Sequence, residues 1–456
     1  MLTCYINEIC AAVNGTLLQD CDAKITAVTT DSRKAGEGQL FIPLVGERFD
    51  GHNYIDSALE SGAAACLTAR QPEKMLPGKG YILVDDTQAA LKALATWHRE
   101  RFLIPVVQVT GSAGKTTTKE MIASVLAQRF CTHKTQANLN NCIGTPLTLL
   151  ELEETHQAAV IETGMDHFGE IRYMGEMVQP DFAVITNVGD AHIENLGNTR
   201  QGTLRAKSEI FENLKPDGIA VLNGDDELLR GITLQNEIVF CGRGENCQVR
   251  VTDIEELGIE GIRCTVTTPR DVYHVHVTTP GAYMIYPASM SIAIGERLGL
   301  TKDEILAGIA AYRPVGSRMH LIHLPEERMI IDDCYNANPQ SMAEALNILS
   351  RTPCRHRLAV LGDMGELGEL SERAHLRVGE LTQELAIDAV IAIGDKAKRM
   401  TEKRTLETHW YASIEEAEEM LRRQFTSGTV ALVKASHAME FERVVAYLEK
   451  TVESSK

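Results

Sequence analysis

The chain lacks any closely spaced pair of cysteines, although it contains 11 of them. No two cysteines stand in a C-x-x-C arrangement, and this absence excludes the common zinc-binding and redox-dithiol motifs. Scattered thiols in a long chain are typical of a reducing compartment, so we expect a cytoplasmic protein.

An excess of positive charge is also missing. The 45 Lys and Arg residues stand against 63 Asp and Glu residues, which gives a formal net charge of −18. Binding to nucleic acid depends on an excess of Lys and Arg, so this balance argues against nucleic acid as a partner. A polyanionic substrate would need locally placed cations and Mg²⁺ instead of a basic surface.

Long apolar runs are absent too. No stretch of the sequence reaches the length that is needed to span a bilayer. The segment Met1–Glu8 has no basic flank before an apolar run, so it does not resemble a signal peptide. We therefore expect a soluble, intracellular protein that does not insert into membranes.

What the chain does contain is a series of short apolar runs that alternate with helical patterns. At 456 residues it is too long for one hydrophobic core, and we predict an α/β protein of three domains. Residues 1–101 are predicted to form a small α/β domain. Residues 102–313 are predicted to form a central parallel-sheet domain with an antiparallel β insertion at 236–280. Residues 314–456 are predicted to form a Rossmann-like domain.

The most informative segment is a glycine-rich turn between an apolar strand at 104–109 and a helical pattern that begins near Lys115. Backbone N–H groups in such a turn bind phosphate oxygens, the lysine contacts the terminal phosphates, and the hydroxyl of Thr116 is placed to bind Mg²⁺. Val109 stands where the usual P-loop pattern has a glycine, so this is a variant. We predict a nucleoside triphosphate site that contains Thr110, Gly111, Ser112, Ala113, Gly114, Lys115, Thr116 and Thr117.

Polar residues follow other predicted strands of the central domain. Glu162 ends the apolar run 159–162, and because ligands bind beyond the carboxyl ends of parallel strands, we interpret it as a Mg²⁺ ligand instead of a solvated carboxylate. His192 follows the predicted strand 183–188, and its position on a loop is compatible with a site residue or with a structural histidine.

Two further segments have an ordinary structural explanation. From its spacing alone, Lys207 is a solvated helix lysine that pairs with Glu209 or Glu212. The amides of 138–141 precede a helix and are explained by turn chemistry, although they would also bind a sugar or a peptide.

The third predicted domain carries two polar loops, 332–339 and 362–368, after neighbouring strands. Helix capping explains either loop alone. Together they predict a ligand-binding face that is turned toward the central domain.

Taken together, these segments resemble the Mur ligase family over essentially the whole chain. The strongest similarities are at 110–119, 138–150, 191–197 and 206–211. The segments 332–339 and 361–368 are most similar to the family member that acts on UDP-N-acetylmuramoyl-tripeptide and D-Ala-D-Ala. Folylpolyglutamate synthetases share the P-loop, so the P-loop alone is not diagnostic.

The resemblance implies an ATP-dependent ligase that activates the carboxylate of UDP-N-acetylmuramoyl-tripeptide as an acyl phosphate. The enzyme would then add D-Ala-D-Ala and form the pentapeptide precursor of peptidoglycan, which serves cell-wall growth, cell shape and cell division. The expected cofactors are ATP and Mg²⁺, and the expected form is a monomer. The alternatives are a related ligase with another acceptor, such as a folate, and a nucleotide-binding paralogue that no longer ligates.

The resemblance also implies residue roles. Lys207 would react with CO₂ to form a carbamate, which requires a neutral amine. The implied catalytic residues are Lys115, Lys207, Glu162 and His192, and the implied metal ligands are Thr116, Glu162, His192 and the carbamate on Lys207. Additional ATP contacts are implied for Arg318, Asp333 and Asn336, and contacts to the UDP-substrate for Ser32, Arg33, Asn138, Asn140 and Asn141.

The chain departs from the family pattern at two places. Pro287 stands where an asparagine would hydrogen-bond adenine, and proline offers no such contact. Asp166 and Phe168 stand where an asparagine and a small residue or proline are usual. The first departure predicts weaker or rearranged recognition of adenine.

Overall fold

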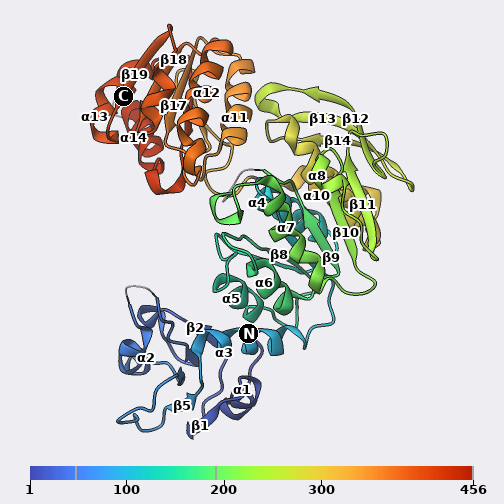
Figure 1. Ribbon diagram of the computed structural model, residues 1–456, viewed down its shortest axis with the longest axis vertical. Helices are drawn as coiled ribbons and strands as arrows, with labels where there is room; N and C mark the ends of the chain where they lie inside the picture. The colour runs from blue at the N-terminus through green and yellow to red at the C-terminus, as the bar shows by residue number, and fades with distance from the viewer. Residues whose placement is uncertain (47–48, 190–192, 454–456) are drawn as a thin grey trace.

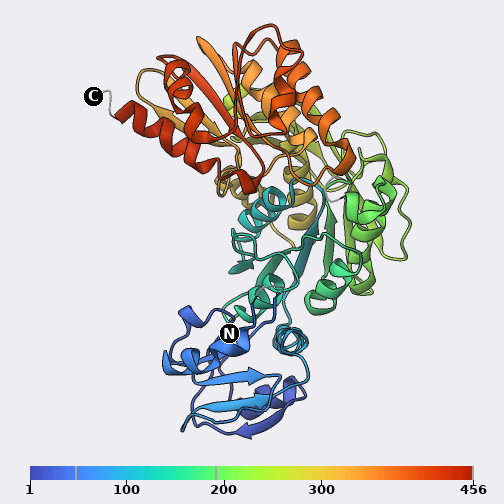
Figure 2. The same cartoon turned by 60° about the vertical axis from the view of Figure 1, so that its left-hand side comes forward.

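The computed structural model describes residues 1–46, 49–189 and 193–453. In these ranges the strands form three sheets that follow one another along the chain, and we call the parts built on them the first, central and third units. The units are arranged in a row along the long axis, with the central one between the other two (Figures 1 and 2).

The first unit is built on a sheet of order β1-β5-β4-β3-β2, in which only β1 runs antiparallel to its neighbour. Its helix α3 begins after Asp86, whose carboxylate accepts a hydrogen bond from Ala89 N at 2.6 Å, as an N-cap does. The elements are β1 (Thr16–Gln19), β2 (Ala27–Thr29), β3 (Gln39–Phe41), β4 (Ala65–Thr68), β5 (Gly80–Leu83), α1 (Ile6–Ala12), α2 (Ile55–Glu60) and α3 (Thr87–Arg99).

The central unit has a nine-stranded sheet of order β14-β13-β12-β11-β10-β9-β6-β8-β7. Neighbours from β7 to β12 are parallel, and β12, β13 and β14 are antiparallel. Its strands are β6 (Val106–Thr110), β7 (Thr132–Lys134), β8 (Ala158–Glu162), β9 (Phe182–Ile185), β10 (Ile219–Asn223), β11 (Glu237–Gly242), β12 (Val249–Glu256), β13 (Ile262–Thr267) and β14 (Val272–Val277). Its helices are α4 (Lys115–Leu126), α5 (Gly144–Leu150), α6 (Glu170–Val178), α7 (Arg200–Ser208), α8 (Glu227–Arg230), α9 (Ile285–Arg297) and α10 (Lys302–Ala311).

The antiparallel strands that the sequence predicts at 236–280 are confirmed for β12 to β14. They do not form a separate sheet, because β11 pairs in parallel with both β10 and β12 and so joins them to the central sheet. The alternation of buried and exposed residues in β14 shows that only one face of this extension is covered.

The third unit is doubly wound, as predicted. Its sheet has the order β15-β16-β20-β17-β18-β19, and one hydrophobic core lies on each face, with α11 and α12 on one and α13 and α14 on the other (Figure 1). The elements are β15 (His320–Leu324), β16 (Arg328–Asp332), β17 (His356–Gly362), β18 (Ala389–Ile393), β19 (Glu407–Tyr411), β20 (Thr429–Lys434), α11 (Pro339–Arg351), α12 (Ser371–Glu384), α13 (Ile414–Gln424) and α14 (Glu442–Glu453).

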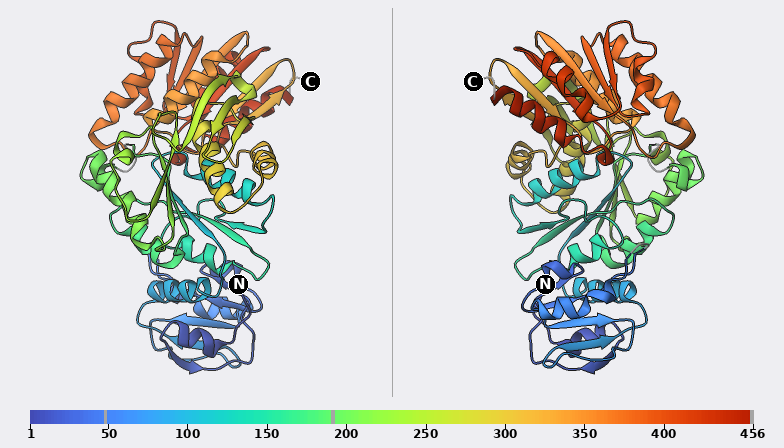
Figure 3. Two further views of the ribbon diagram at one scale, coloured as in Figure 1. Left: turned by 90° about the vertical axis from the view of Figure 1, so that its right-hand side faces the viewer. Right: turned by 90° about the vertical axis from the view of Figure 1, so that its left-hand side faces the viewer.

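The third unit lies over the central unit, and Figure 3 shows this arrangement from two sides. Ile259 and Tyr283 of the central unit pack against the core of the third unit. Glu256 forms an ion pair with Arg351 of α11 across the same boundary. These contacts bring the loops of the third unit to the carboxyl ends of the central strands.

No helix within the described ranges combines the length and the apolar character that a membrane span requires. All 11 cysteines lie within those ranges and are free thiols.

Candidate active site

The turn between β6 and α4 requires glycine at two positions. Gly111 has φ of +153°, and a Cβ on it would lie 1.9 Å from Thr186 Oγ1. Gly114 precedes α4 in the left-handed region, with φ of +75°. The turn can therefore approach its neighbours and a ligand more closely than other residues would permit.

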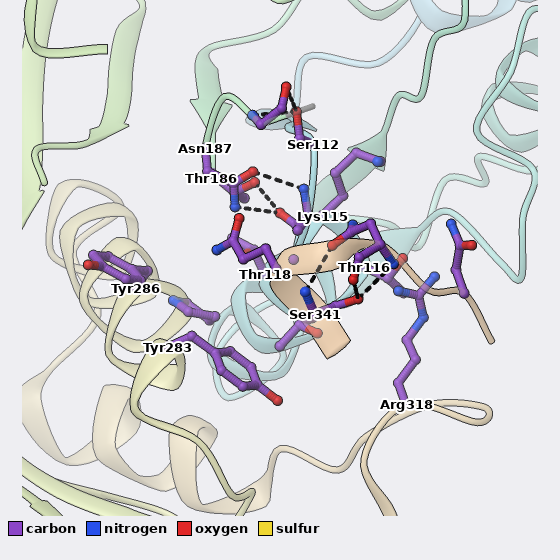
Figure 4. A pocket seen from close by; sticks show the side chains of 18 of the residues that line it. Ser112, Lys115, Thr116, Thr118, Thr186, Asn187, Tyr283, Tyr286, Arg318 and Ser341 are labelled. Atoms are coloured by element: carbon purple, nitrogen blue, oxygen red, sulfur yellow. Dashed lines mark hydrogen bonds between the residues drawn. The ribbon is translucent and has the colours of Figure 1, made fainter. Parts of the chain in front are cut away.

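The loop after β9 fixes the shape of this turn (Figure 4). Ala113 N donates a hydrogen bond to Asn187 Oδ1 at 2.9 Å, and Asn187 Nδ2 donates to Ala113 O at 3.0 Å. Thr186 Oγ1 donates to the same carbonyl at 2.6 Å. The strand predicted at 183–188 ends at Ile185 in the structure, so the Asn187 amide lies on the loop, where it can hold the turn.

Lys115 begins α4, and its ammonium donates a hydrogen bond to Gly111 O at 2.9 Å. Burial lowers its pKa, the charge of Glu162 opposes that shift, and the charge of Arg318 adds to it. Lys115 and Arg318 therefore lie close enough to influence one another, although they come from different units. Two cations that face one pocket from different units are suited to a polyphosphate.

Glu162 ends β8 directly opposite Val109, as the sequence predicts. Its Oε1 accepts hydrogen bonds from Thr116 Oγ1 at 3.1 Å and from Asn140 Nδ2 at 2.8 Å. Its Oε2 is buried and has no hydrogen-bond donor among the described residues, and the Lys119 ammonium is 3.8 Å away. Within the described part of the chain, one oxygen of this carboxylate therefore keeps a free hydrogen-bonding position.

These oxygens suit a divalent cation. Mg²⁺ binds oxygen ligands at about 2.1 Å in an octahedron, which places adjacent ligands about 3 Å apart. Thr116 Oγ1 and Glu162 Oε1 have nearly this separation, at 3.1 Å. Among the described residues no group of three or more His, Cys, Asp or Glu side chains could hold a metal ion, so a site here needs other ligands.

Lys207 lies on α7 and is only 2% exposed. The solvated interpretation that its spacing favoured is therefore wrong. Glu209 instead accepts hydrogen bonds from Gly169 N and Arg172 N, and Glu212 pairs with Arg172. Burial lowers the pKa of Lys207 well below its usual range, and the charge of Lys115 lowers it further. The environment thus favours the neutral, nucleophilic amine.

The side-chain amides of the 138–141 loop have different hydrogen-bond partners. Asn140 binds Glu162, as described above, whereas Asn141 Oδ1 accepts hydrogen bonds from Ile143 N and Gly144 N at the start of α5. Turn chemistry therefore explains Asn141, and it does not explain Asn140. Asn138, Asn140 and Asn141 all line the same pocket as the P-loop.

The third unit contributes the opposite wall of this pocket, whose volume is about 1020 Å³. Arg318, Asp333 and Asn336 all line it. The buried ammonium of Lys434 donates hydrogen bonds to Asp333 Oδ2 at 2.5 Å and to Asn336 O at 2.9 Å, and so holds the loop after β16 in place.

Some predicted residues lie elsewhere. Ser32 and Arg33 are in the first unit and do not line this pocket, and Arg33 pairs with Asp31. His192 lies outside the described residues, so its predicted role stays a prediction.

Pro287 lines the pocket from the first turn of α9, where its missing N–H has no helical partner to lose. Beside it, Tyr286 donates a hydrogen bond to Asp225 Oδ2 at 3.0 Å. Several pocket residues lie outside the segments that the sequence indicates, because only the fold brings them to the P-loop: Asp225, Arg243, Tyr283, Tyr286 and Glu344.

Comparison with known proteins identifies the family of this chain. Three family models match in succession: the Mur ligase family catalytic domain at residues 24–99, the Mur ligase middle domain at 109–295, and the Mur ligase glutamate ligase domain at 317–437. The chain belongs to the Mur ligase family. The resemblance drawn from the sequence motifs is thereby confirmed.

Relatives within this family match over nearly their full lengths. The UDP-N-acetylmuramoyl-tripeptide–D-alanyl-D-alanine ligase of Escherichia coli (strain K12) is 36% identical over 99% of this chain and 99% of its own length. The protein of the same name from Bacillus subtilis (strain 168) is 35% identical over 98% of each chain.

Solved structures in the Mur ligase family support the fold. MurF from Acinetobacter baumannii superposes with a TM-score of 0.91 at 32% identity and covers 98% of this chain and 99% of its own. MurF from Thermotoga maritima, solved in complex with ADP, gives a TM-score of 0.84 at 30% identity, with 94% and 98% covered. These matches confirm the predicted α/β fold of three domains.

Proposed function

We propose that this chain is an ATP-dependent ligase that joins D-Ala-D-Ala to UDP-N-acetylmuramoyl-tripeptide in peptidoglycan synthesis. The observation that carries the proposal is the convergence of Lys115, Glu162 and Arg318 on one pocket, with a buried Lys207 close enough for the charge of Lys115 to lower its pKa. The names of the full-length relatives and the ADP complex of the Thermotoga maritima structure support the choice of substrates and nucleotide.

The reaction has two steps. A carboxylate oxygen of the tripeptide attacks the γ-phosphorus of ATP, the bond from that phosphorus to the bridging oxygen breaks, and ADP leaves. The amine of D-Ala-D-Ala then attacks the acyl carbon, phosphate leaves with the bonding electrons, and the amine loses a proton. Lys115 stabilises the charge that develops on the phosphoryl oxygens in the first step.

Thr116, Glu162, His192 and a carbamate on Lys207 would hold Mg²⁺, with Asn140 orienting the Glu162 carboxylate. When bound, the cation neutralises phosphate charge. The low pKa of Lys207 supports the carbamate, because a neutral amine attacks CO₂ and then loses a proton to form the anion.

The three units would divide the remaining tasks. We place their boundaries near residues 101 and 314, with the UDP-substrate bound by Ser32 and Arg33 in the first unit and by Asn138, Asn140 and Asn141 in the central one. The third unit supplies Arg318, Asp333 and Asn336 to ATP and excludes water from the acyl phosphate. We further propose that the enzyme works as a monomer in the cytoplasm.

The test is phosphate release from ATP and Mg²⁺, with each substrate omitted in turn and the product identified by mass. The proposal predicts that the pentapeptide forms only when both the tripeptide and D-Ala-D-Ala are present. Turnover with a different acceptor would favour a sister ligase. Measurable ATP binding without any turnover would favour the non-catalytic paralogue, for which Pro287 is the supporting observation.

A further inference from the structure

Arg318 lines the pocket and has no charged partner among the described residues. Within the described residues its guanidinium has no ion pair and no hydrogen bond, and it lies half-buried on the loop before β15. Figure 4 shows the side chain extending from this loop toward the Thr116 side of the P-loop. An arginine in such a position would adopt many rotamers unless something else restrained it.

The ring of Tyr335 supplies that restraint. The Cζ atom of Arg318 lies 3.8 Å from the centroid of the ring, which is a close cation–π contact. A carboxylate would also orient the guanidinium, but it would neutralise the charge and occupy N–H donors. An aromatic face leaves the donors free for phosphate oxygens.

Two hydrogen bonds connect the loop that carries Arg318 to the loop that carries Tyr335. Tyr335 N donates a hydrogen bond to Ser317 O at 3.0 Å, and Met319 N donates to Asp333 Oδ1 at 3.1 Å. These two bonds flank Arg318 and connect its loop to the loop that carries Tyr335. The position of the guanidinium therefore depends on the Tyr335 loop through both backbone and side chain.

Tyr335 itself has a second neighbour. The imidazole of His437 stacks on it with ring centroids 5.5 Å apart and an interplanar angle of 28°. His437 follows β20, the strand that also carries Lys434. Stacking limits the rotation of the tyrosine ring and thereby fixes the surface that Arg318 contacts.

We propose that Tyr335 is a positioning residue, which orients Arg318 toward the terminal phosphates of ATP through the face of its ring. The proposal rests on the ligase function proposed above. It assigns the phenol hydroxyl no role, so the aromatic face alone is required. Its effect should appear in kcat more than in the KM for ATP, because the contact aligns a charge for the transition state.

The experiment is a double-mutant cycle on the full chain. Tyr335→Leu should lower kcat about tenfold with less than a threefold change in KM for ATP, whereas Tyr335→Phe should keep most of the activity. Arg318→Ala should lower kcat further. In the Arg318→Ala background, Tyr335→Leu should have almost no additional effect, because the residue through which it acts is gone.

The cycle separates this proposal from its alternatives. An equal loss from Tyr335→Leu with and without Arg318 would overturn it, and so would a loss from Tyr335→Phe as large as that from Tyr335→Leu. Thermal melting of each variant shows whether it is folded. If Tyr335→Leu does not fold, the cycle is repeated with Tyr335→Met, which is unbranched but lacks the aromatic face. An inactive wild-type protein would refute the ligase function, whereas an active one with additive losses would refute only the role of Tyr335.

Discussion

At the scale of single residues, the neighbours of a lysine determine its chemistry. Lys115, Lys207 and Lys434 are all lysines by sequence, yet their surroundings differ. Lys115 bonds a backbone carbonyl, Lys434 bonds a carboxylate, and Lys207 is buried near the charge of Lys115. Only Lys207 has its pKa lowered well below the usual range. Lys207 and Lys434 are equally buried, so what distinguishes Lys207 is that the charge near it is the Lys115 ammonium, whereas Lys434 lies beside the Asp333 carboxylate.

We predict that Lys207→Ala lowers turnover at least a hundredfold, because the proposed carbamate would be lost from the metal site. Added short carboxylic acids should restore part of the activity by replacing the carbamate oxygens. The measurement is phosphate release with and without added acid. Lys302→Ala serves as the control, because Lys302 pairs with Asp271 at the surface. Wild-type turnover of Lys207→Ala without added acid would contradict the carbamate role.

Replacing Pro287 by asparagine should improve the binding of ATP. Pro287→Asn places an amide at the pocket wall, and an amide can bond both N6 and N7 of adenine, which is worth about 1–3 kcal/mol. We expect the KM for ATP to fall about tenfold while that for GTP does not. Steady-state kinetics with both nucleotides test this, and equal changes for both would show that the base does not contact this position.

At the scale of elements, α3 shows how one helix joins two units. Its start follows from local chemistry, because the Asp86 side chain caps it and its apolar residues repeat at helical spacing. The sequence does not show what it packs against. In the structure His98 and Arg99, at its end, bond to Leu152 O and Val178 O of the central unit.

This contact makes stability depend on pH. Burial lowers the pKa of His98 from 6.5 to about 4, so the folded chain keeps this histidine neutral while the unfolded chain binds a proton below pH 6.5. Stability from His98 is therefore present above pH 6.5 and is lost as the pH falls to about 4, by up to about 3 kcal/mol. We expect the melting temperature of the wild type to fall more steeply over this window than that of His98→Gln.

His274→Gln is the matched control, because His274 is exposed on β14 and should leave the wild-type slope unchanged. Parallel slopes for the wild type and His98→Gln would show that His98 is not the group responsible.

At the scale of the whole molecule, the pocket exists because the third unit lies on the central one. Ile259, at the turn between β12 and β13, packs against the third unit although it belongs to the extension of the central sheet. The nine-stranded sheet thus supports the unit that carries Arg318. Weakening this contact should admit water to the acyl phosphate.

We predict that Ile259→Asp raises the amount of phosphate released per pentapeptide formed, because part of the acyl phosphate would hydrolyse. The measurement compares phosphate with product by mass. Val272→Asp, an exposed position on β14, should keep the wild-type ratio. An unchanged ratio for Ile259→Asp would show that this contact does not protect the intermediate.

The sequence alone determined the features that local chemistry controls. The glycine turn between β6 and α4, the strand that ends at Glu162 and the doubly wound third unit follow from glycine positions, apolar runs and helical spacing, and the structure confirms all three elements. The family motifs could also be recognised without the fold. A short strand such as β4 was missed, because its apolar run follows a helix closely and local pattern does not separate them.

Only the tertiary structure decided which residues share an environment. Lys207 is a surface lysine by spacing and a buried amine in the fold, and Tyr335 meets Arg318 because two loops of the third unit pair. The physical reason is that burial and contact arise between segments far apart in the chain. Periodicity records which face of an element is apolar, but it carries no information about what covers that face.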